Sequence, residues 1–366
     1  MANIYREGKK MEFKKIGVLT SGGDAPGMNA VIRAITRAAN AAGVETYGIF
    51  EGYQGLMDGN LTRLSGSDVS NIISKGGTML YTARATEFKE PSGMEKALKT
   101  CKEHGIDGII AIGGDGTFRG ATDLSAHGIP TIGLTGTIDN DITATDYTVG
   151  FDTAMNSVLD CVDKLRDTCE SHARCSVVEV MGRDAGYIAL QAGIAVGAIG
   201  IVIKEFPFDE DAMIERIIKS KAEGRRSFVV VVAEGVKDAN GKPYGEDLAK
   251  RIEALTEVET RFVRLAHIIR GGAPTLRDRL AASMMGSAAV KLLLEGKSNL
   301  VVCERNAEIV TYEINFALTL DKMYKNKLKP GDLDRFAASE IHEMEILAEV
   351  RRKEMLDMYN AAMSLM

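Results

Sequence analysis

The chain has 366 residues, of which 45% are hydrophobic and 26% are charged, so it can bury more than one compact core. Its formal net charge is −6 and no block of five or more basic residues occurs, which argues against binding to nucleic acid. A run of about 18 uninterrupted apolar residues is absent from the sequence, so we expect no membrane span.

Two further features concern the compartment. The amino-terminal segment 1–15 is charged and lacks an apolar run of signal-peptide length, so we expect a soluble protein that is not exported. The five cysteines are odd in number and form no Cys-x-x-Cys pair, so neither a disulfide framework nor a zinc site is indicated. We therefore expect the cysteines to be reduced thiols and the protein to be cytoplasmic.

Short runs rich in Val and Ile alternate with segments of helical pattern, which is typical of β-α-β units with buried parallel strands. We therefore predict an α/β fold with two Rossmann-like domains, mostly parallel sheets and a C-terminal helical extension. The predicted strands are residues 16–19, 108–112, 131–134, 176–180, 199–203 and 228–233.

The domain switch is expected near Gly150, where a helix over residues 152–169 begins. From Asp332 to Met366 the sequence has neither Gly nor Pro, and its apolar residues follow helical spacing. This pattern predicts a long terminal helix.

The first glycine-rich loop spans residues 20–30, after a predicted strand and before a helix. Glycine at Gly22 and Gly23 would let backbone amides approach phosphate oxygens, and the helix start adds partial positive charge. The isolated loop would also fit a plain structural turn.

A second loop, residues 113–120, stands in the same context and lacks the Walker pattern. Asp115 is suited to meet Mg²⁺, which binds few protein carboxylates and takes its other ligands from water and nucleotide phosphate. The alternative is an Asp that only caps a helix.

The third segment, residues 136–141, places Asp139 and Asp141 two residues apart, so that in extended backbone both would point to one side. That arrangement suits a proton acceptor beside a metal, although an exposed acidic turn has the same composition. Arginines at the predicted strand ends and helix starts suggest an anionic ligand, while each alone also fits a solvated surface charge: Arg84, Arg174, Arg183, Arg261 and Arg270.

Taken together, these segments resemble the bacterial ATP-dependent 6-phosphofructokinases from about residue 15 to about residue 320. The most specific matches are residues 19–24, 136–141, 180–183 and 267–272. The resemblance implies transfer of the γ-phosphate of ATP to the 1-hydroxyl of fructose 6-phosphate, in glycolysis.

The resemblance also implies individual roles. Asp139 would be the base that takes the proton of the sugar hydroxyl, with Thr137 and Asp141 beside it. Gly22, Arg84 and Arg183 would steady the transferring phosphate, and Asp115 would serve the Mg²⁺. Further contacts to ATP would come from Phe50, Ala85, Gly114, Gly116 and Thr117.

Fructose 6-phosphate would lie against Thr137, Asp139, Met181, Gly182, Arg183, Glu234, His267 and Arg270. By the same resemblance, Arg174 and Arg261 would reach its 6-phosphate from a neighbouring subunit, so a complete site requires a homotetramer or homodimer. Residues 1–150 with 269–318 would form the larger ATP-binding domain. Residues 151–268 with 319–366 would form the smaller sugar-phosphate domain and the terminal helix.

Several positions depart from the family pattern. Phe50 matches the family's adenine-site tyrosine, and the small Ala85 follows Arg84. At the family's effector site, Arg33, Arg37 and Arg166 match basic positions, whereas Ile199 replaces the usual Mg²⁺-binding glutamate. Allosteric control is therefore expected to be altered or absent.

Three alternatives stay open. Pyrophosphate-dependent phosphofructokinases share most of these segments but typically have Asp at Gly116 and Lys at Gly136. Diacylglycerol and NAD kinases also use the loop at 113–117, but lack the segments around Asp139 and Arg270. A non-catalytic sugar-phosphate sensor would retain the fold, although intact Asp115 and Asp139 argue against it.

Overall fold

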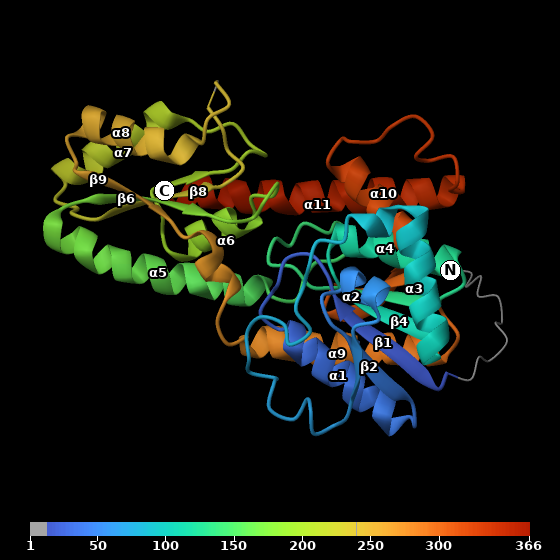
Figure 1. Cartoon of the computed structure of the whole chain (residues 1–366). Helices are drawn as coiled ribbons and strands as arrows, with labels where there is room; N and C mark the ends of the chain where they lie inside the picture. Colours follow the sequence, from blue (N-terminus) through green and yellow to red (C-terminus); the bar gives the residue numbers. More distant parts are fainter. Residues whose placement is uncertain (1–12, 239) are drawn as a thin grey trace. The chain divides into compact units, whose positions relative to one another are not determined.

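The computed structural model of the chain describes residues 13–238 and 240–366 (Figure 1). The amino-terminal segment for which we predicted no signal peptide thus lies, up to residue 12, outside the described residues. The fold divides into two compact α/β units, which confirms the predicted fold class. Unit 1 comprises the described residues up to Thr137, together with Ile142–Gly150 and Gly272–Ala348. Unit 2 comprises Ile138–Asp141, Phe151–Gly271 and Glu349–Met366.

Unit 1 contains a seven-stranded sheet with the order β11-β10-β5-β4-β1-β2-β3. The five inner strands are parallel, whereas β3 and β11 pair antiparallel at the two edges. The strands are β1 Lys15–Thr20, β2 Glu45–Ile49, β3 Leu61–Leu64, β4 Gly108–Gly113, β5 Thr131–Thr135, β10 Leu300–Arg305 and β11 Glu308–Glu313.

Helices cover both faces of this sheet, which is why β4 and β5 are buried along their whole length. On one face α1 packs against α9, as Figure 1 shows, and a Cβ on Gly286 would lie only 2.8 Å from Cβ of Ala34. The helices of unit 1 are α1 Met28–Ala41, α2 Tyr53–Asp58, the 3-10 helix η1 Glu87–Lys89, α3 Pro91–His104, α4 Asp115–Ala126, α9 Leu276–Leu294 and α10 Ile314–Tyr324.

Unit 2 contains a four-stranded parallel sheet with the order β7-β8-β6-β9. The two inner strands are buried throughout, as their runs of Val led us to expect. Its elements are α5 Phe151–His172, β6 Cys175–Val180, α6 Tyr187–Ala195, β7 Gly200–Val202, α7 Glu210–Ala222, β8 Phe228–Ala233, α8 Tyr244–Thr256, β9 Thr260–Arg264 and the 3-10 helix η2 Ala266–Arg270.

The predicted terminal helix is present as α11, Ala338–Leu365. It begins after a turn-rich segment and contributes its residues up to Ala348 to unit 1 and the rest to unit 2. Our predicted division differs here, because it assigned residues 319–366 to the second domain. The structure retains α10 in unit 1, since Phe316, Ala317 and Leu320 belong to the hydrophobic core of that unit.

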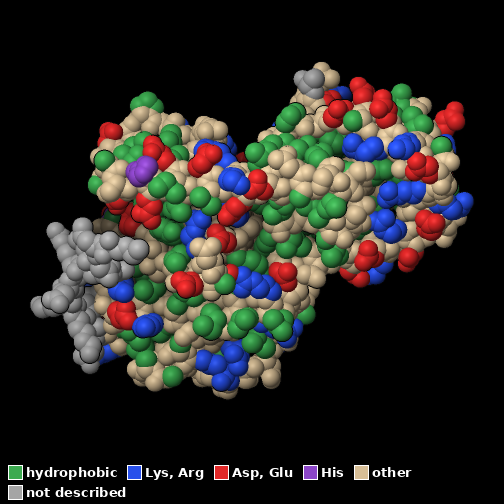
Figure 2. All heavy atoms as spheres, turned by 180° about the vertical axis from the view of Figure 1, so that it is seen from behind, with side chains coloured by type: hydrophobic (Ala, Val, Ile, Leu, Met, Phe, Trp, Pro, Cys, Tyr) green, Lys and Arg blue, Asp and Glu red, His purple; other side chains and the backbone are tan. Residues whose placement is uncertain are grey.

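All five cysteines are free thiols, and four of them are buried. None of the helices in the described part of the chain is long and apolar enough to cross a membrane. On the face drawn in Figure 2, basic and acidic side chains are interspersed with hydrophobic ones.

Candidate functional site

The first glycine-rich loop leaves β1 at Thr20 and enters α1 at Met28. Gly22 has a φ of 85° and Gly27 a φ of 109°, in the left-handed region that favours glycine. A Cβ on Gly27 would also lie 2.5 Å from a side-chain carbon of Val149. Close packing therefore fixes the course of the loop.

Two threonines tie this loop to the segment that carries Arg84. Oγ1 of Thr20 donates to the carbonyl of Tyr81 at 2.8 Å, and Oγ1 of Thr82 donates to the carbonyl of Gly22 at 2.7 Å. Arg84 is exposed two residues further on. The structure thus brings the segment of Arg84 to the first loop, as the predicted ATP site requires.

The second loop joins β4 to α4 and contacts the first loop. The N–H of Ser21 donates to the carbonyl of Ile112 at 3.0 Å, and Oγ1 of Thr117 donates to the carbonyl of Ser21 at 3.0 Å. A Cβ on Gly113 would lie 2.2 Å from Oγ1 of Thr117, so glycine is required for this approach. Both loops lie at the carboxyl ends of neighbouring parallel strands, where open α/β sheets bind ligands.

Sequence reasoning missed Tyr53, whose hydroxyl donates to the carbonyl of Thr117 at 2.5 Å. Burial raises the pKa of this tyrosine, and a Cβ on Gly120 would lie 2.6 Å from its ring. Phe50, the aromatic predicted for the adenine site, has its ring centroid 6.0 Å from that of Tyr81. The aromatic side chain that contacts the α4 start is therefore Tyr53.

Asp115 begins α4 and contacts Asp321 of α10, a residue that no sequence pattern singled out. The Asp321 side chain is 3% exposed and accepts the N–H of Thr143 at 2.6 Å. Burial and the neighbouring charge of Asp115 raise the pKa of Asp321 well above its usual range. Oδ1 of Asp115 is buried without a hydrogen-bond partner among the described residues.

A cation would satisfy this orphaned oxygen. No cluster of three or more His, Cys, Asp or Glu side chains in the described residues is placed to hold a metal ion. Mg²⁺ needs no such cluster, because it is usually held by one or two carboxylates plus substrate phosphates and water. The surroundings of Asp115 therefore fit a nucleotide-bound Mg²⁺.

The third predicted segment crosses from unit 1 to unit 2. In unit 1 the N–H of Gly136 donates to the carbonyl of Gly113 at 2.9 Å, and Oγ1 of Thr148 donates to the carbonyl of Thr137 at 2.7 Å. Thr137 thus belongs to the glycine-loop edge, whereas Asp139 and Asp141 belong to unit 2.

Asp139 lies among the charged side chains that the sequence led us to group. It is 5% exposed, and burial, with the negative charge of Asp141, raises its pKa to about 6. The positive charges of Arg270 and Arg183 act in the opposite direction, and Glu234 adds to the rise. A carboxyl group that titrates near neutral pH is suited to act as a general base.

Arg183 lies on a loop between β6 and α6 that two glutamates hold. Its φ is 55°, and its N–H donates to Oε1 of Glu234 at 2.7 Å, as does that of Gly182 at 3.3 Å. At the other end of the loop the N–H of Gly186 donates to Oε1 of Glu205 at 2.8 Å. Glu234 was a predicted site residue, whereas Glu205 was missed because no motif marks it.

Other predicted sugar-phosphate residues follow the carboxyl ends of the same strands. Met181 follows β6 and is buried, Glu234 follows β8, and His267 and Arg270 lie on η2 after β9. His267 is exposed. Within unit 2 the structure therefore collects these residues at one edge of the sheet.

Arg174 and Arg261 lie elsewhere in unit 2. Arg174 directly precedes β6, about 20 Å along that strand from its carboxyl end, and Arg261 is the second residue of β9, about 10 Å from the carboxyl end of that strand. Nε of Arg174 pairs with Glu259 at 2.7 Å, and Arg261 pairs with the same carboxylate. The structure does not bring these two arginines to the other sugar-phosphate residues of the same chain.

The predicted effector arginines are divided between the units. Arg33 and Arg37 lie on α1 of unit 1, and Arg166 lies on α5 of unit 2, where it donates to the carbonyl of Val196. Ile199 is 2% exposed and packs into the hydrophobic core of unit 2. Its side chain therefore belongs to the core.

Comparisons with known proteins identify the family of the chain. The family model of phosphofructokinase matches residues 15–293. The chain is 49% identical over 316 residues to "ATP-dependent 6-phosphofructokinase 1" of Clostridium perfringens. The aligned residues cover 86% of this chain and 97% of that protein.

Solved structures share the fold. The phosphofructokinase of Saccharomyces cerevisiae is 32% identical to this chain, with a TM-score of 0.84. The superposition covers 96% of this chain and 50% of the yeast chain. A pyrophosphate-dependent phosphofructokinase of Marinobacter aquaeolei is 22% identical with a TM-score of 0.70, covering 82% of this chain and 83% of that one, a likeness of fold alone. On this sequence match, and with its two α/β units, the chain belongs to the phosphofructokinase family.

Proposed function

We propose that the chain is an ATP-dependent 6-phosphofructokinase, which makes fructose 1,6-bisphosphate in glycolysis. The observation that carries this proposal is Asp139, a carboxyl group whose pKa is raised to about 6 by burial and by the negative charge of Asp141, and on which the positive charges of Arg270 and Arg183 also act. The name of the Clostridium perfringens relative supports ATP as the phosphate donor.

The proposed reaction is a direct transfer in which Asp139 takes the proton of the sugar 1-hydroxyl. The hydroxyl oxygen then forms a bond to the γ-phosphorus of ATP, the bond to the β,γ-bridging oxygen breaks, and ADP leaves. Arg183 and Arg84 would neutralise the charge of the transferring group, and Gly22 would offer it a backbone amide. Thr137 and Asp141 would flank the base.

Unit 1 would hold ATP with the two glycine loops. Gly114, Gly116 and Thr117 would contact its phosphates at the start of α4, where backbone amides and the helix dipole favour anions. Asp115 would hold Mg²⁺, which supplies positive charge to the nucleotide phosphates when bound. Phe50 and Ala85 would border the nucleotide.

Unit 2 would hold fructose 6-phosphate through Met181, Gly182, Glu234, His267 and Arg270. Arg174 and Arg261 would serve the site of a neighbouring subunit in a homotetramer or homodimer. The distance of these arginines from the strand ends that carry Glu234 supports that assignment.

A hybrid test addresses the shared site. We expect Arg261→Ala and Asp139→Ser each to be nearly inactive, and mixed oligomers of the two to regain activity. Restored sites would combine an intact base from one chain with an intact arginine from another. Oligomers shown to be mixed by native mass spectrometry, yet inactive, would refute sharing.

We further propose altered allosteric control through Arg33, Arg37 and Arg166, since Ile199 offers no oxygen ligand. A reducing, cytoplasmic setting is consistent with five free thiols. Cell fractionation would test the location.

A coupled assay with fructose 6-phosphate and either ATP or pyrophosphate tests the main proposal. We expect turnover with ATP and Mg²⁺ that chelation abolishes, and no turnover with pyrophosphate. Equal or faster turnover with pyrophosphate would make this chain a pyrophosphate-dependent enzyme, and no turnover with either donor would favour a sensor.

A further inference from the structure

A buried arginine interrupts the apolar stripe of α11. The buried residues of this helix recur at helical spacing, and an apolar side chain is expected at Arg351. Arg351 is only 7% exposed, and a buried guanidinium is unfavourable unless it is paired. The other buried residues of the stripe are Met344, Ala348, Met355 and Ala362.

The partners of Arg351 lie in unit 2. Its Nη2 donates to the carbonyl of Asn140 at 3.3 Å, and its guanidinium carbon lies 4.4 Å from the ring centroid of Tyr187. Its Nη1 lies 3.6 Å from Oε2 of Glu354, one turn along the same helix. These contacts offset the burial of the charge.

Asn140 is the residue between Asp139 and Asp141. It is 2% exposed and has a φ of 48°, a left-handed conformation that costs free energy for a residue other than glycine. The hydrogen bond from Arg351 fixes the carbonyl of this residue, and with it the peptide group that leads into Asp141. The course of the acidic segment thus depends on a side chain far along the sequence.

We propose that Arg351 is a positioning residue, which holds the Asp139–Asp141 segment in its buried conformation through the carbonyl of Asn140. The inference rests on the proposed function, because it assigns a role in the same reaction. Arg351 lies beyond residue 293, where the family match ends. The extension would therefore act on the reaction centre.

The test compares Arg351→Met and Arg351→Lys with Lys353→Met, a matched change at a cation on α11 that is 71% exposed. We expect Arg351→Met to lower kcat about 10- to 100-fold with the KM for ATP nearly unchanged, because the base is displaced. Arg351→Lys should recover part of kcat, and Lys353→Met should behave as the wild type.

The pH profile separates positioning from loss of folded protein. Burial is the main cause of the raised pKa of Asp139, so a loosened segment should move the acid limb of kcat/KM below about pH 6. The other charges that act on Asp139 come from Asp141, Arg270, Arg183 and Glu234, and all remain in the variant. Partial unfolding would lower the amplitude of the profile without moving its midpoint.

Two failures can be distinguished. A wild-type chain without phosphofructokinase activity would refute the proposed function. An active wild type, together with an Arg351→Met variant whose kcat and acid limb equal those of Lys353→Met, would refute the inference alone.

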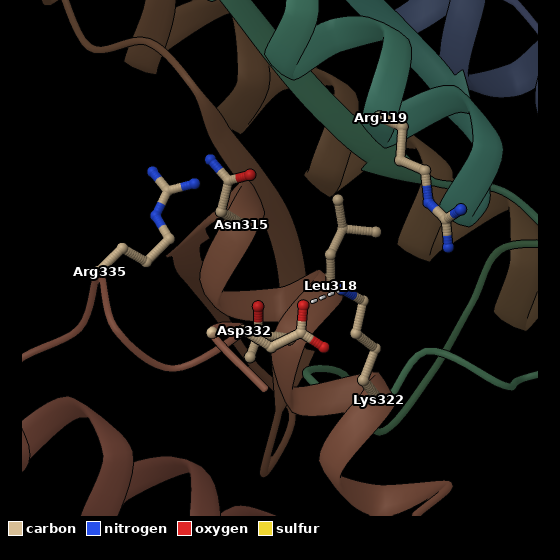
Figure 3. Close-up of a pocket in the computed structure, with 8 residues that line it drawn as sticks. Arg119, Asn315, Leu318, Lys322, Asp332 and Arg335 are labelled. Atoms are coloured by element: carbon tan, nitrogen blue, oxygen red, sulfur yellow. Dashed lines mark hydrogen bonds and ion pairs between the residues drawn. The ribbon is translucent and has the colours of Figure 1, made fainter. Parts of the chain in front are cut away.

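A second, independent observation is a cavity of about 380 Å³ in unit 1 (Figure 3). Its wall is built by α4, by α10 and by the turn-rich segment before α11. The polar side chains that line it are Arg119, Asn315, Thr319, Lys322, Asp332 and Arg335.

The charges of this cavity are mostly positive. Nζ of Lys322 lies 2.8 Å from Oδ1 of Asp332, which neutralises one cation. Arg119 and Arg335 form no ion pair with any described residue, and Figure 3 shows them on opposite sides of Lys322. Two exposed guanidinium groups without an ion-pair partner therefore line one cavity, in a chain whose net charge is −6. The guanidinium carbon of Arg335 also lies 5.6 Å from the ring centroid of Phe336.

We infer that this cavity binds a small organic anion with two phosphate or carboxylate groups, one for each guanidinium. Both groups accept the paired hydrogen bonds that arginine donates. Every lining residue except Arg119 lies beyond residue 293. The inference does not depend on the proposed function.

Isothermal titration calorimetry in magnesium-free buffer tests it with pyrophosphate and, separately, succinate. We expect at least one anion to bind, and its Kd to rise about tenfold or more in Arg119→Ala and in Arg335→Ala. Arg63→Ala, which removes an exposed cation of β3 in the same unit, should leave the Kd unchanged. Whichever anion binds identifies the class.

Pyrophosphate binding at the predicted ATP site would persist in both arginine variants. Persistence of all binding in Arg119→Ala and Arg335→Ala, or no binding of either anion to the wild type, would refute the inference.

Discussion

The carboxylate of Glu205 accepts the backbone N–H of Gly186 at 2.8 Å, at the end of the loop that carries Arg183. A Cβ on Gly186 would lie 2.7 Å from Oε2 of Glu205, an oxygen that is buried and without a partner in the described residues. Glu205 therefore holds one end of the Arg183 loop while Glu234 holds the other.

We predict that Glu205→Leu lowers kcat/KM for fructose 6-phosphate about 10- to 100-fold, because the loop loses its anchor. Glu205→Gln should retain most activity, since an amide oxygen accepts the same N–H. Steady-state kinetics of both variants would show the difference. Glu215→Leu, at an exposed glutamate of α7, is the control, and equal kinetics in all three would contradict the anchor role.

Asp139 should set the acid limb of activity. With a pKa of about 6, the carboxyl group is protonated at lower pH and cannot accept the hydroxyl proton. We expect kcat/KM to fall below about pH 6, and Asp141→Asn to move this limb to lower pH by removing a negative charge. A limb that stays in place would argue against this pair of residues.

The same pKa predicts a stability change of known sign. The folded-state pKa lies above the usual 3.8, so ionisation of Asp139 destabilises the fold as pH rises through about 6. Asp139→Asn should thus gain up to about 3 kcal/mol over the wild type at about pH 8 and little below about pH 4. It should also lower kcat by about 10²- to 10⁴-fold. Urea unfolding at both pH values measures the first effect.

Gly116 offers a test of donor choice. A Cβ there would meet nothing within 4 Å, so Gly116→Asp should fold normally. We expect its KM for ATP to rise about tenfold or more, because the new carboxylate would repel nucleotide phosphates. Gly66→Asp, at another open glycine of unit 1, should bind ATP as the wild type does. Unchanged ATP kinetics in both variants would place the phosphates elsewhere.

Because isoleucine stands at position 199, we predict that ADP activates the enzyme only weakly. The side chain of Ile199 is part of the unit 2 core and supplies no oxygen to a metal-bridged diphosphate. We expect ADP to change the KM for fructose 6-phosphate less than about twofold. Strong activation that disappears in Arg33→Ala would show that the effector site works without that ligand.

The sequence predicted most of the inner strands, because parallel strands buried on both faces consist of continuous runs of Val and Ile. All six predicted strands are present. Among the described residues, the strands that were missed are β2, β3, β9, β10 and β11. Four of them, β2, β3, β9 and β11, have residues that are partly exposed or polar, and their places depend on neighbours distant in sequence. The fifth, β10, was missed although it is an inner strand buried from Val301 to Glu304.

The site divides in the same way. Glycine loops at strand ends could be predicted, since backbone approach to a ligand demands glycine there. Tyr53, Glu205, Asp321 and Arg351 could not, because each acts through one tertiary contact that leaves no local pattern.

The burial of the cysteines has a practical consequence. Cys101 and Cys175 have their pKa values raised to about 12 by burial, whereas Cys161 on α5 is partly exposed. A thiol-reactive dye should label about one cysteine per native chain, and all five once the chain unfolds. Counting labelled thiols would report how much of the chain is open, and Cys161 offers a single attachment point for a fluorescent probe.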